Sequence, residues 1–301
     1  MRYSEFITEE TEIPVKDKPG FQHLAQLLKT QCGDYLDIFN HESGRVLYRG
    51  TDPGLPQAFS GRSRDDRKPK DSNPTAQLMV DDALTKLGIA ARRGNSLFTT
   101  SDQNMAGDFG VIYIIIPKNS AVYSWSNDPD MTLTPSSVRL LSNSRDWRLL
   151  KRAADEAGRI TADAMDAAWR GSQRGDKTGY DVLQSNVDHA AALAEIAQGM
   201  YMVGKNIIVK QMSDPITAKP HLDWVVENWP DTVLGKYIAR EMYHSLAKPV
   251  KIDPQKLQAT YNFTDKNLEA ALKNGNEVLI HGEYIAMRPV VWNQLTEQGL
   301  V

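Results

Sequence analysis

The sequence predicts an α+β fold, in which strands near both ends of the chain form a core and helices fill the middle. Short apolar segments typical of strands occur at residues 45–49, 95–101, 110–117 and 276–287. Between residues 135 and 250, apolar residues instead recur at steps of three and four, as on the buried face of a helix. We therefore expect a core built from residues 1–134 and 251–301, interrupted by a helical insertion or subdomain over residues 135–250.

Composition limits the class of protein. The 301 residues have a formal net charge of −3, so bulk charge gives no reason to expect nucleic-acid binding. The single cysteine, Cys32, argues against a disulfide framework and a cysteine-rich zinc site. No stretch approaches the roughly 18 apolar residues needed to span a bilayer, and the first residues lack the apolar region of a Sec signal peptide. We expect a cytoplasmic protein without membrane contact.

The first elements of the chain are a helical region and a short strand. Apolar residues lie at helical spacing within residues 21–39, and the strand at residues 45–49 follows. Arg49 is expected to end this strand, and Gly50 to let the backbone turn sharply away.

A charged segment separates this strand from the next helix. Residues 60–74 contain charges, proline and serine but no large apolar residue, so we expect an exposed, mobile loop. The following helix begins at Pro74 and ends at Gly88. The run at residues 110–117 is too apolar to have a solvent-exposed face, which predicts a buried central strand.

After the helical region, strand character returns. A short helix precedes residue 275, with Asp265 or Thr264 as its expected N-cap. Two strands follow, "NEVLI" and "EYIAM", and the final helix begins at Pro289.

Common catalytic and metal-binding motifs are missing from the sequence. It contains no G-x-G-x-x-G fingerprint, no G-x-S-x-G elbow and no H-E-x-x-H pair. The pairs His221 with Asp223 and His281 with Glu283 have a spacing compatible with metal binding, but two exposed polar groups on one strand face explain it better. We expect no metal site.

Three segments far apart in the sequence place polar groups on apolar strands: "LYRG", "SLFTTSD" and "NEVLI". A buried polar group costs free energy unless it has a partner, so a shared ligand is a natural explanation. In order and separation, these segments resemble the Arg-Ser-Glu type of mono-ADP-ribosyltransferases, which are toxin-like enzymes. The segments "NSLFTTSD" and "NLEAALKNGNEVLI" are in particular similar to bacteriophage-encoded members.

The resemblance implies a fold and a set of site residues. It implies a split, two-sheet NAD-binding core, with NAD as co-substrate and glycosyl transfer as the reaction. Arg49 matches the NAD-binding arginine, beside Gly50, and Glu277 matches the catalytic glutamate. The matching triplet after the aromatic residue completes the cofactor-binding set, which is Phe98, Thr99, Thr100 and Ser101. The match covers about twenty residues in total, and the helical middle of the chain has no counterpart in the family pattern.

These residue types suit the chemistry that the family performs. Cleavage of the nicotinamide glycosidic bond develops positive charge on the ribose, which a carboxylate such as Glu277 stabilises. Arginine offers a rigid, permanently charged fork for the diphosphate, which explains Arg49. The hydroxyls of Thr99 and Ser101 are expected to brace the site or to bind the ribose, and Phe98 or Tyr48 to stack near nicotinamide.

One position departs from the family pattern. Members that modify arginine have a second glutamate two residues before the catalytic one, and others have glutamine, whereas this chain has Gly275. Asn274, Asn276 or the segment at residues 60–74 would then serve the acceptor, or activity would be reduced to NAD hydrolysis.

The acceptor is expected to be a macromolecule, with a protein favoured over nucleic acid. The net negative charge disfavours nucleic acid, although a basic run keeps it open: Arg62, Arg64, Arg67, Lys68 and Lys70. The rival interpretation is a non-catalytic structural or interaction protein, such as a phage virion component, that retains the fold. A phage-encoded protein would be found in the host cytoplasm or in the virion. The acceptor and the oligomeric state are not fixed by the sequence.

Overall fold

The computed structural model describes most of the two terminal regions and less of the middle. The described residues are 11–41, 45–51, 53–67, 74–128, 135–156, 214–216, 218, 223, 226–227, 231, 236, 239 and 250–301. The chain divides into two compact units. Unit 1 consists of residues 1–132 and 254–301, and unit 2 of residues 133–253. The fold is therefore α+β, with both chain ends in the same unit.

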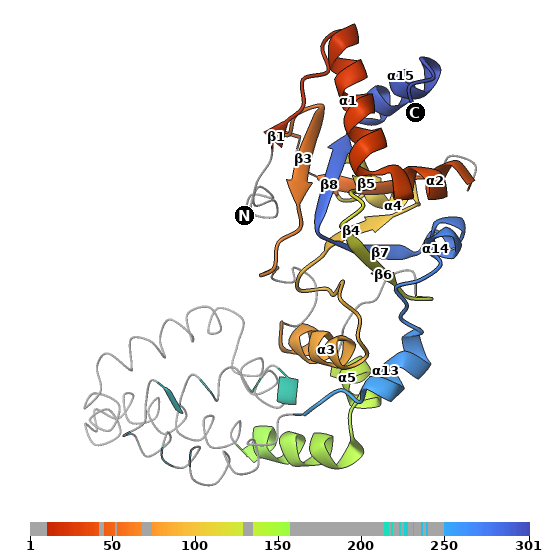
Figure 1. The fold of residues 1–301 in the computed structure, drawn as a ribbon. Coiled ribbons are helices and arrows are strands. Elements are labelled where there is room, and N and C mark those ends of the chain that lie inside the picture. Colours follow the sequence, from red (N-terminus) through yellow and green to blue (C-terminus); the bar gives the residue numbers. More distant parts are fainter. Residues whose placement is uncertain are drawn as a thin grey trace, which may run out of the picture. The chain divides into compact units, whose positions relative to one another are not determined.

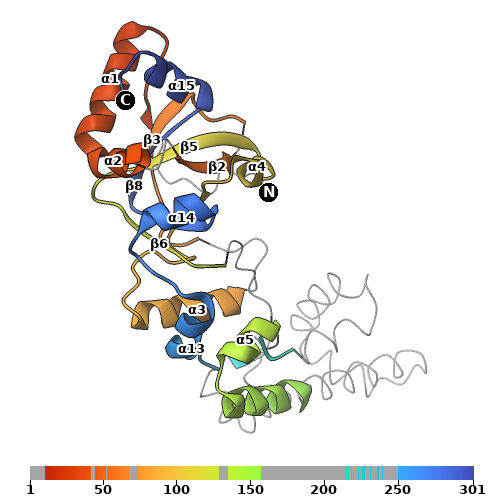
Figure 2. The same ribbon diagram turned by 90° about the vertical axis from the view of Figure 1, so that its right-hand side faces the viewer.

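One antiparallel sheet organises unit 1, and Figures 1 and 2 show its strands from two sides. The described strands follow the order β1-β3-β8-β5-β2-β4-β7-β6. Their bounds are β1 Thr11–Glu12, β2 Leu47–Thr51, β3 Ala58–Arg62, β4 Leu97–Thr100, β5 Val111–Pro117, β6 Val122–Trp125, β7 Glu277–His281 and β8 Glu283–Met287. The last two strands lie inside the sheet, so the two ends of the chain form it together.

The expectation of two separate sheets differs from this structure. The β2 strand pairs with β5 over its whole length, from Leu47 opposite Ile115 to Thr51 opposite Val111. Its other edge pairs with β4 at one position, Tyr48 opposite Thr100. The described strands thus form one sheet with a narrow junction between a five-strand part and a three-strand part, rather than two sheets.

Apolar helices cover the sheet. The helices are α1 (Lys18–Gln31), α2 (Gly33–His41), α14 (Leu268–Asn274) and α15 (Pro289–Glu297). They bury Leu28, Phe39, Leu272 and Leu295 in one cluster with β5, whose residue Ile116 is fully buried. Burial of this kind contributes about 25 cal/mol per Å² of apolar surface. The prediction of a buried central strand at residues 110–117 is confirmed.

The predicted helix at residues 21–39 is in fact two helices. Asp17 caps α1 by accepting a hydrogen bond from the Gly20 amide at 2.9 Å. The break comes at Cys32, which is fully buried, and burial raises the pKa of its thiol to about 12 while the charge of Lys118 opposes this shift.

Two other expectations about local structure are wrong. The segment at residues 60–74 is not an exposed loop throughout, because residues 60–62 belong to β3 and Ser63 is buried. The amide and hydroxyl of Ser63 bond to the backbone of Gly282, which ties the segment to the β7–β8 turn. The helix before Gly275 begins later than Asp265 predicts: its N-cap is Asn267, in the left-handed conformation and without a side-chain cap.

Three further helices, α3, α13 and α4, belong to unit 1. Helix α3 (Pro74–Lys86) has the predicted bounds, with Gly88 at a positive φ of 80° just after it, and packs against α13 (Pro254–Tyr261). Helix α4 (Gln103–Gly107) follows β4 and is capped by Asp102.

Unit 2 is mostly helical where it is described. Helix α5 (Pro135–Leu141) and the helical residues 144–156 bury Val138, Leu141 and Leu150. Beyond residue 156, the helical region predicted for residues 135–250 lies largely outside the described residues. In the described part of the chain, no helix is long and apolar enough to cross a membrane.

Candidate functional site

The three segments that carry the family resemblance lie on neighbouring strands. Thr100 of β4 is paired with Tyr48 of β2 on one side and with Glu277 of β7 on the other. Arg49, next to Tyr48, therefore lies near the same row of residues as Glu277. The fold brings the seven residues that the sequence assigned to the site onto these strands or directly next to them.

The hydroxyl triplet after Phe98 holds the segment that carries Glu277. Thr99 Oγ1 donates to the carbonyl oxygen of Val278 at 2.8 Å, and Thr100 Oγ1 to that of Gly275 at 3.2 Å. Ser101 Oγ donates to Leu272 at the end of α14 at 2.6 Å. The triplet thus braces the connection between α14 and β7, which is one of its two expected roles.

Arg49 and Gly50 differ from expectation in their local structure. The β2 strand continues through both residues to Thr51, so the strand does not end at Arg49 and the chain does not turn at Gly50. A Cβ on Gly50 would lie 2.1 Å from the carbonyl oxygen of Ala106. Gly50 therefore allows α4 to approach the strand. The Arg49 side chain crosses to β4, where its Nη1 donates to the Phe98 carbonyl oxygen at 2.7 Å.

Glu277 is paired with an arginine that the sequence did not single out. Arg93 Nη1 lies 3.5 Å from Glu277 Oε2, and the two side chains are 11% and 18% exposed. Partial burial strengthens such a pair relative to one in water. The positive charge of Arg93 thus offsets the negative charge of the Glu277 carboxylate.

The ring of Phe98 is covered by a second arginine. The guanidinium carbon of Arg67 lies 3.4 Å from the ring centroid, and that of Arg93 lies 4.7 Å from it. Burial lowers the pKa of Arg67 to about 9, with the positive charges of Arg49 and Arg93 adding to the shift. The expectation that Arg67 lies in an exposed loop is therefore wrong. The other aromatic candidate, Tyr48, is half-buried, and desolvation raises the pKa of its hydroxyl.

Residues of α3 hold both arginine segments in place. Asp81 accepts hydrogen bonds from the amides of Arg93 at 3.1 Å and Gly94 at 2.9 Å, and desolvation raises the pKa of Asp81 to about 6. A Cβ at Gly94 would lie 2.4 Å from the Asp81 carboxylate oxygen, so a side chain here would displace that carboxylate. Buried Gln77 donates to the Arg67 carbonyl oxygen at 3.2 Å.

Gly275 has a backbone role. It ends α14 in the left-handed conformation, with φ of 75°, and its amide bonds to Ala271. Only glycine adopts this conformation at little cost. The buried neighbour Asn276 donates to the carbonyl oxygen of Ser126 at 2.8 Å, so its side chain has a structural partner.

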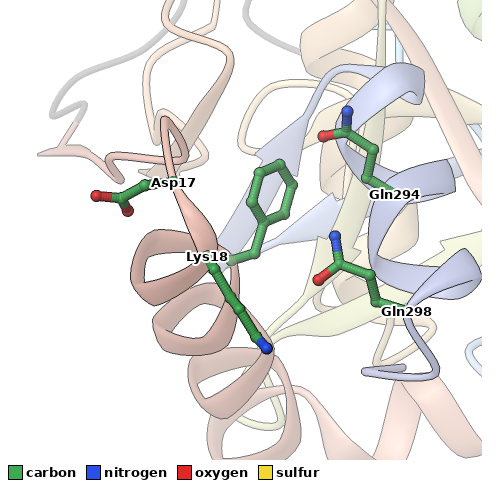
Figure 3. Close-up of a pocket in the computed structure, with 5 residues that line it drawn as sticks. Asp17, Lys18, Gln294 and Gln298 are labelled. Carbon is green, nitrogen blue, oxygen red and sulfur yellow. The ribbon is translucent and has the colours of Figure 1, made fainter.

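The described residues hold no group of three or more histidine, cysteine, aspartate or glutamate side chains that could bind a metal ion. His281 Nδ1 lies 2.9 Å from the carbonyl oxygen of Asn95, and Glu283 pairs with Lys118 at 2.8 Å. The other pair considered was His221 with Asp223, and His221 lies outside the described residues. A surface pocket of about 370 Å³ lies elsewhere, between the start of α1 and α15, as Figure 3 shows. Its lining includes Asp17 and Gln294 but none of the site residues.

Sequence reasoning missed Arg93 and misplaced Arg67. A signal for Arg93 existed, since "ARRGN" places two arginines in a glycine-containing turn directly before the triplet strand. No local signal distinguished Arg67 from its neighbours in the sequence, exposed Arg62 and half-buried Arg64.

Comparison of the chain with protein-family models, with curated proteins and with solved structures finds no match.

Proposed function

We propose that the protein is an NAD-dependent mono-ADP-ribosyltransferase that modifies a macromolecular acceptor. The observation that carries the proposal is the row from Tyr48 through Thr100 to Glu277 across three neighbouring strands. Residues that resemble the family's motif lie far apart in the sequence yet meet at one place: the Thr99 hydroxyl bonds to Val278, which is 179 positions away. A surface arginine or a polar run on its own would not require this meeting.

The proposed roles follow from charge and geometry. Glu277, the first residue of β7, stabilises the positive charge that develops on the ribose. The hydroxyl triplet fixes the backbone of that strand, so the carboxylate is held in place before substrate arrives. Arg49, anchored to the Phe98 carbonyl oxygen, supplies a permanent positive charge for the NAD diphosphate.

A second candidate is a non-catalytic protein that keeps this fold. Two observations favour it. Gly275 offers no side chain to an acceptor, and its φ of 75° disfavours any replacement. The carboxylate of Glu277 is also paired with Arg93.

The test measures nicotinamide release from NAD beside transfer of labelled ADP-ribose to a cell lysate, with protease and nuclease treatment of the product. We expect the parent to cleave NAD and Glu277→Gln to lose about 100-fold or more in turnover, because the lost charge acts mainly in the transition state. Glu283→Gln is the control, since Glu283 lies on β8, which pairs with β3 and β5 rather than with β7, and its side chain pairs with Lys118. Equal turnover of Glu277→Gln and parent would remove Glu277 from the mechanism. No NAD cleavage by the parent would favour the non-catalytic candidate.

A further inference from the structure

Three arginines from separate segments contact Phe98, two of them at its ring and one at its backbone carbonyl oxygen. Arg49 belongs to β2, Arg67 follows β3 and Arg93 precedes β4. The last two hold their guanidinium carbons 3.4 and 4.7 Å from the ring centroid, and Arg49 bonds to the Phe98 carbonyl oxygen. Like charges in a partly buried place repel one another, so stability alone does not explain the cluster.

The cluster also contains donors that the protein leaves unused. Across the described residues, the Nε–H groups of Arg67 and Arg93 are buried without an acceptor. Glu277 reaches Nη1 of Arg93, while Asp81 is directed at the amides of Arg93 and Gly94. A buried unsatisfied donor in a folded protein calls for an explanation, and a ligand that brings acceptor atoms and negative charge provides one.

Both arginines are held by their backbones. The amide of Arg67 donates to the Gly94 carbonyl oxygen at 2.8 Å, and its carbonyl oxygen accepts from Gln77 at 3.2 Å. The amide of Arg93 donates to Asp81 at 3.1 Å. Because these contacts are made within the protein itself, little ordering is needed when a ligand binds.

We propose that Arg67 and Arg93, together with Arg49, form a preorganised binding site for the diphosphate group of a nucleotide. The proposal rests on the function proposed above for the choice of nucleotide, and it adds two arginines to which the family pattern assigns no role. Guanidinium groups bind phosphate through paired, charge-assisted hydrogen bonds. Because Nη1 of Arg93 also lies 3.5 Å from Glu277, a bound phosphate competes with that carboxylate and couples ligand binding to the placement of Glu277.

Titration calorimetry at low salt tests the site without any catalytic step, with ADP and inorganic pyrophosphate as probes. We expect the parent to bind both probes, and Arg67→Gln and Arg93→Gln each to weaken ADP binding by about tenfold or more. The matched control is Arg64→Gln, since Arg64 lies on the same segment but pairs with Asp66 at 2.8 Å at the surface. This control should change ADP affinity less than about twofold.

Circular dichroism checks that each variant is folded. If a glutamine variant does not fold, the lysine variant at the same position, Arg67→Lys or Arg93→Lys, takes its place. The lysine variants keep the charge but lose the fork, so they too should bind ADP more weakly than the parent. The proposal is overturned if the parent binds neither probe, if folded Arg67 and Arg93 variants bind ADP like the parent, or if Arg64→Gln loses as much affinity as they do.

These outcomes are distinct from those of the transferase test. If the parent does not cleave NAD but the Arg67 and Arg93 variants lose ADP affinity, the result would support the diphosphate site and reject the transferase. NAD cleavage by the parent, with unchanged ADP affinity in both variants, would support the transferase and reject this site.

Discussion

At the scale of single residues, Gly50 shows how a missing side chain positions the site. Its Cα faces the backbone of α4 so closely that a methyl group would lie 2.1 Å from the Ala106 carbonyl oxygen and 2.8 Å from Phe109. Backbone atoms cannot rotate away as side chains do, so the strand next to Arg49 or the α4 helix would have to shift.

We therefore expect Gly50→Ala to lower the free energy of unfolding by about 2 kcal/mol or more, as overpacking against backbone does. Gly54→Ala is the control, because a Cβ at Gly54 meets no atom within 4 Å. Urea unfolding followed by circular dichroism gives both values. A Gly50→Ala variant as stable as Gly54→Ala would show that α4 does not pack here as described.

Asp81 predicts a pH dependence of stability. Desolvation raises its pKa from 3.8 to about 6, although hydrogen bonds from the amides of Gly94 and Arg93 oppose the shift. The folded state thus binds a proton more tightly than the unfolded state. The stabilisation from this proton is fully present below about pH 4 and is lost as pH rises through about 6.

Asp81→Asn should remove this dependence. Between pH 4 and 7, the free energy of unfolding of the parent should lose about 2 kcal/mol more than that of the variant, from about 1.4 kcal/mol for each pKa unit. Thermal unfolding across this pH range measures the difference. Parallel curves for parent and variant would assign the pH dependence to other groups.

If the proposed function holds, the conformation of Gly275 bears on the choice of acceptor. A side chain at this position meets no atom within 4 Å, so Gly275→Glu has room, but its positive φ should cost about 1 kcal/mol. The family resemblance predicts that this variant gains transfer to simple guanidino compounds. Gly299→Ala, at φ of 63° with equally open surroundings, is the control for the cost of conformation alone. Unchanged guanidino transfer in a folded variant would contradict the analogy.

At the scale of elements, the site depends on how β4 holds the α14–β7 connection. The hydroxyl of Thr99 donates a hydrogen bond to the Val278 carbonyl oxygen. Because the Thr99 side chain is buried, water cannot replace this hydrogen bond. We expect Thr99→Val to lower the free energy of unfolding by about 1–2 kcal/mol. Thr30→Val is the control, since Thr30 bonds to Gln26 on the exposed face of α1. Equal effects, measured by urea unfolding, would deny β4 this role.

The elements differ in how well the sequence predicts them. The run "VIYIIIP" could only be a buried strand, and Pro74 and Gly88 delimit α3 because both residues act locally. By contrast, β1 has two residues and exists through pairing with β3.

The candidate site could be predicted only where its residues carry a local sequence pattern. Arg49, the triplet and Glu277 carry a local pattern, whereas Arg67 and Arg93 become site residues through contacts that Gln77 and Asp81 make across the fold. The position of Arg67 is decided by burial over Phe98, and its charged neighbours in the sequence pointed the other way. Tertiary contacts of this kind leave no periodicity to read.

At the scale of the whole molecule, the chain leaves unit 1 and returns to it at neighbouring points. The amide of Asn127 donates to the Tyr261 carbonyl oxygen at 3.0 Å, and Trp125 pairs with Thr264. A short connection can therefore replace what lies between. We expect a variant in which a glycine–serine linker replaces residues 129–253 to fold cooperatively, because unit 1 contains the sheet and its own apolar cluster.

Thermal unfolding and amide exchange would test this variant, with exchange protection in β5 as the readout. If the charged groups of unit 1 suffice for NAD cleavage, the variant retains it and loses only transfer to the natural acceptor. An unfolded or aggregated variant would show that unit 1 needs residues of unit 2.

The positions of β7 and β8 inside the sheet have a consequence for biosynthesis. β8 fills the space between β3 and β5, and β7 the space between β4 and β6, so these four strands keep unpaired edges until residues 277–287 have been made. Throughout the synthesis of unit 2, the ribosome-bound chain presents these edges beside the apolar residues of β5. Unpaired edges of this kind recruit other chains, so we expect the nascent protein to be open to aggregation until β7 and β8 are made, and to gain from chaperones that shield such edges.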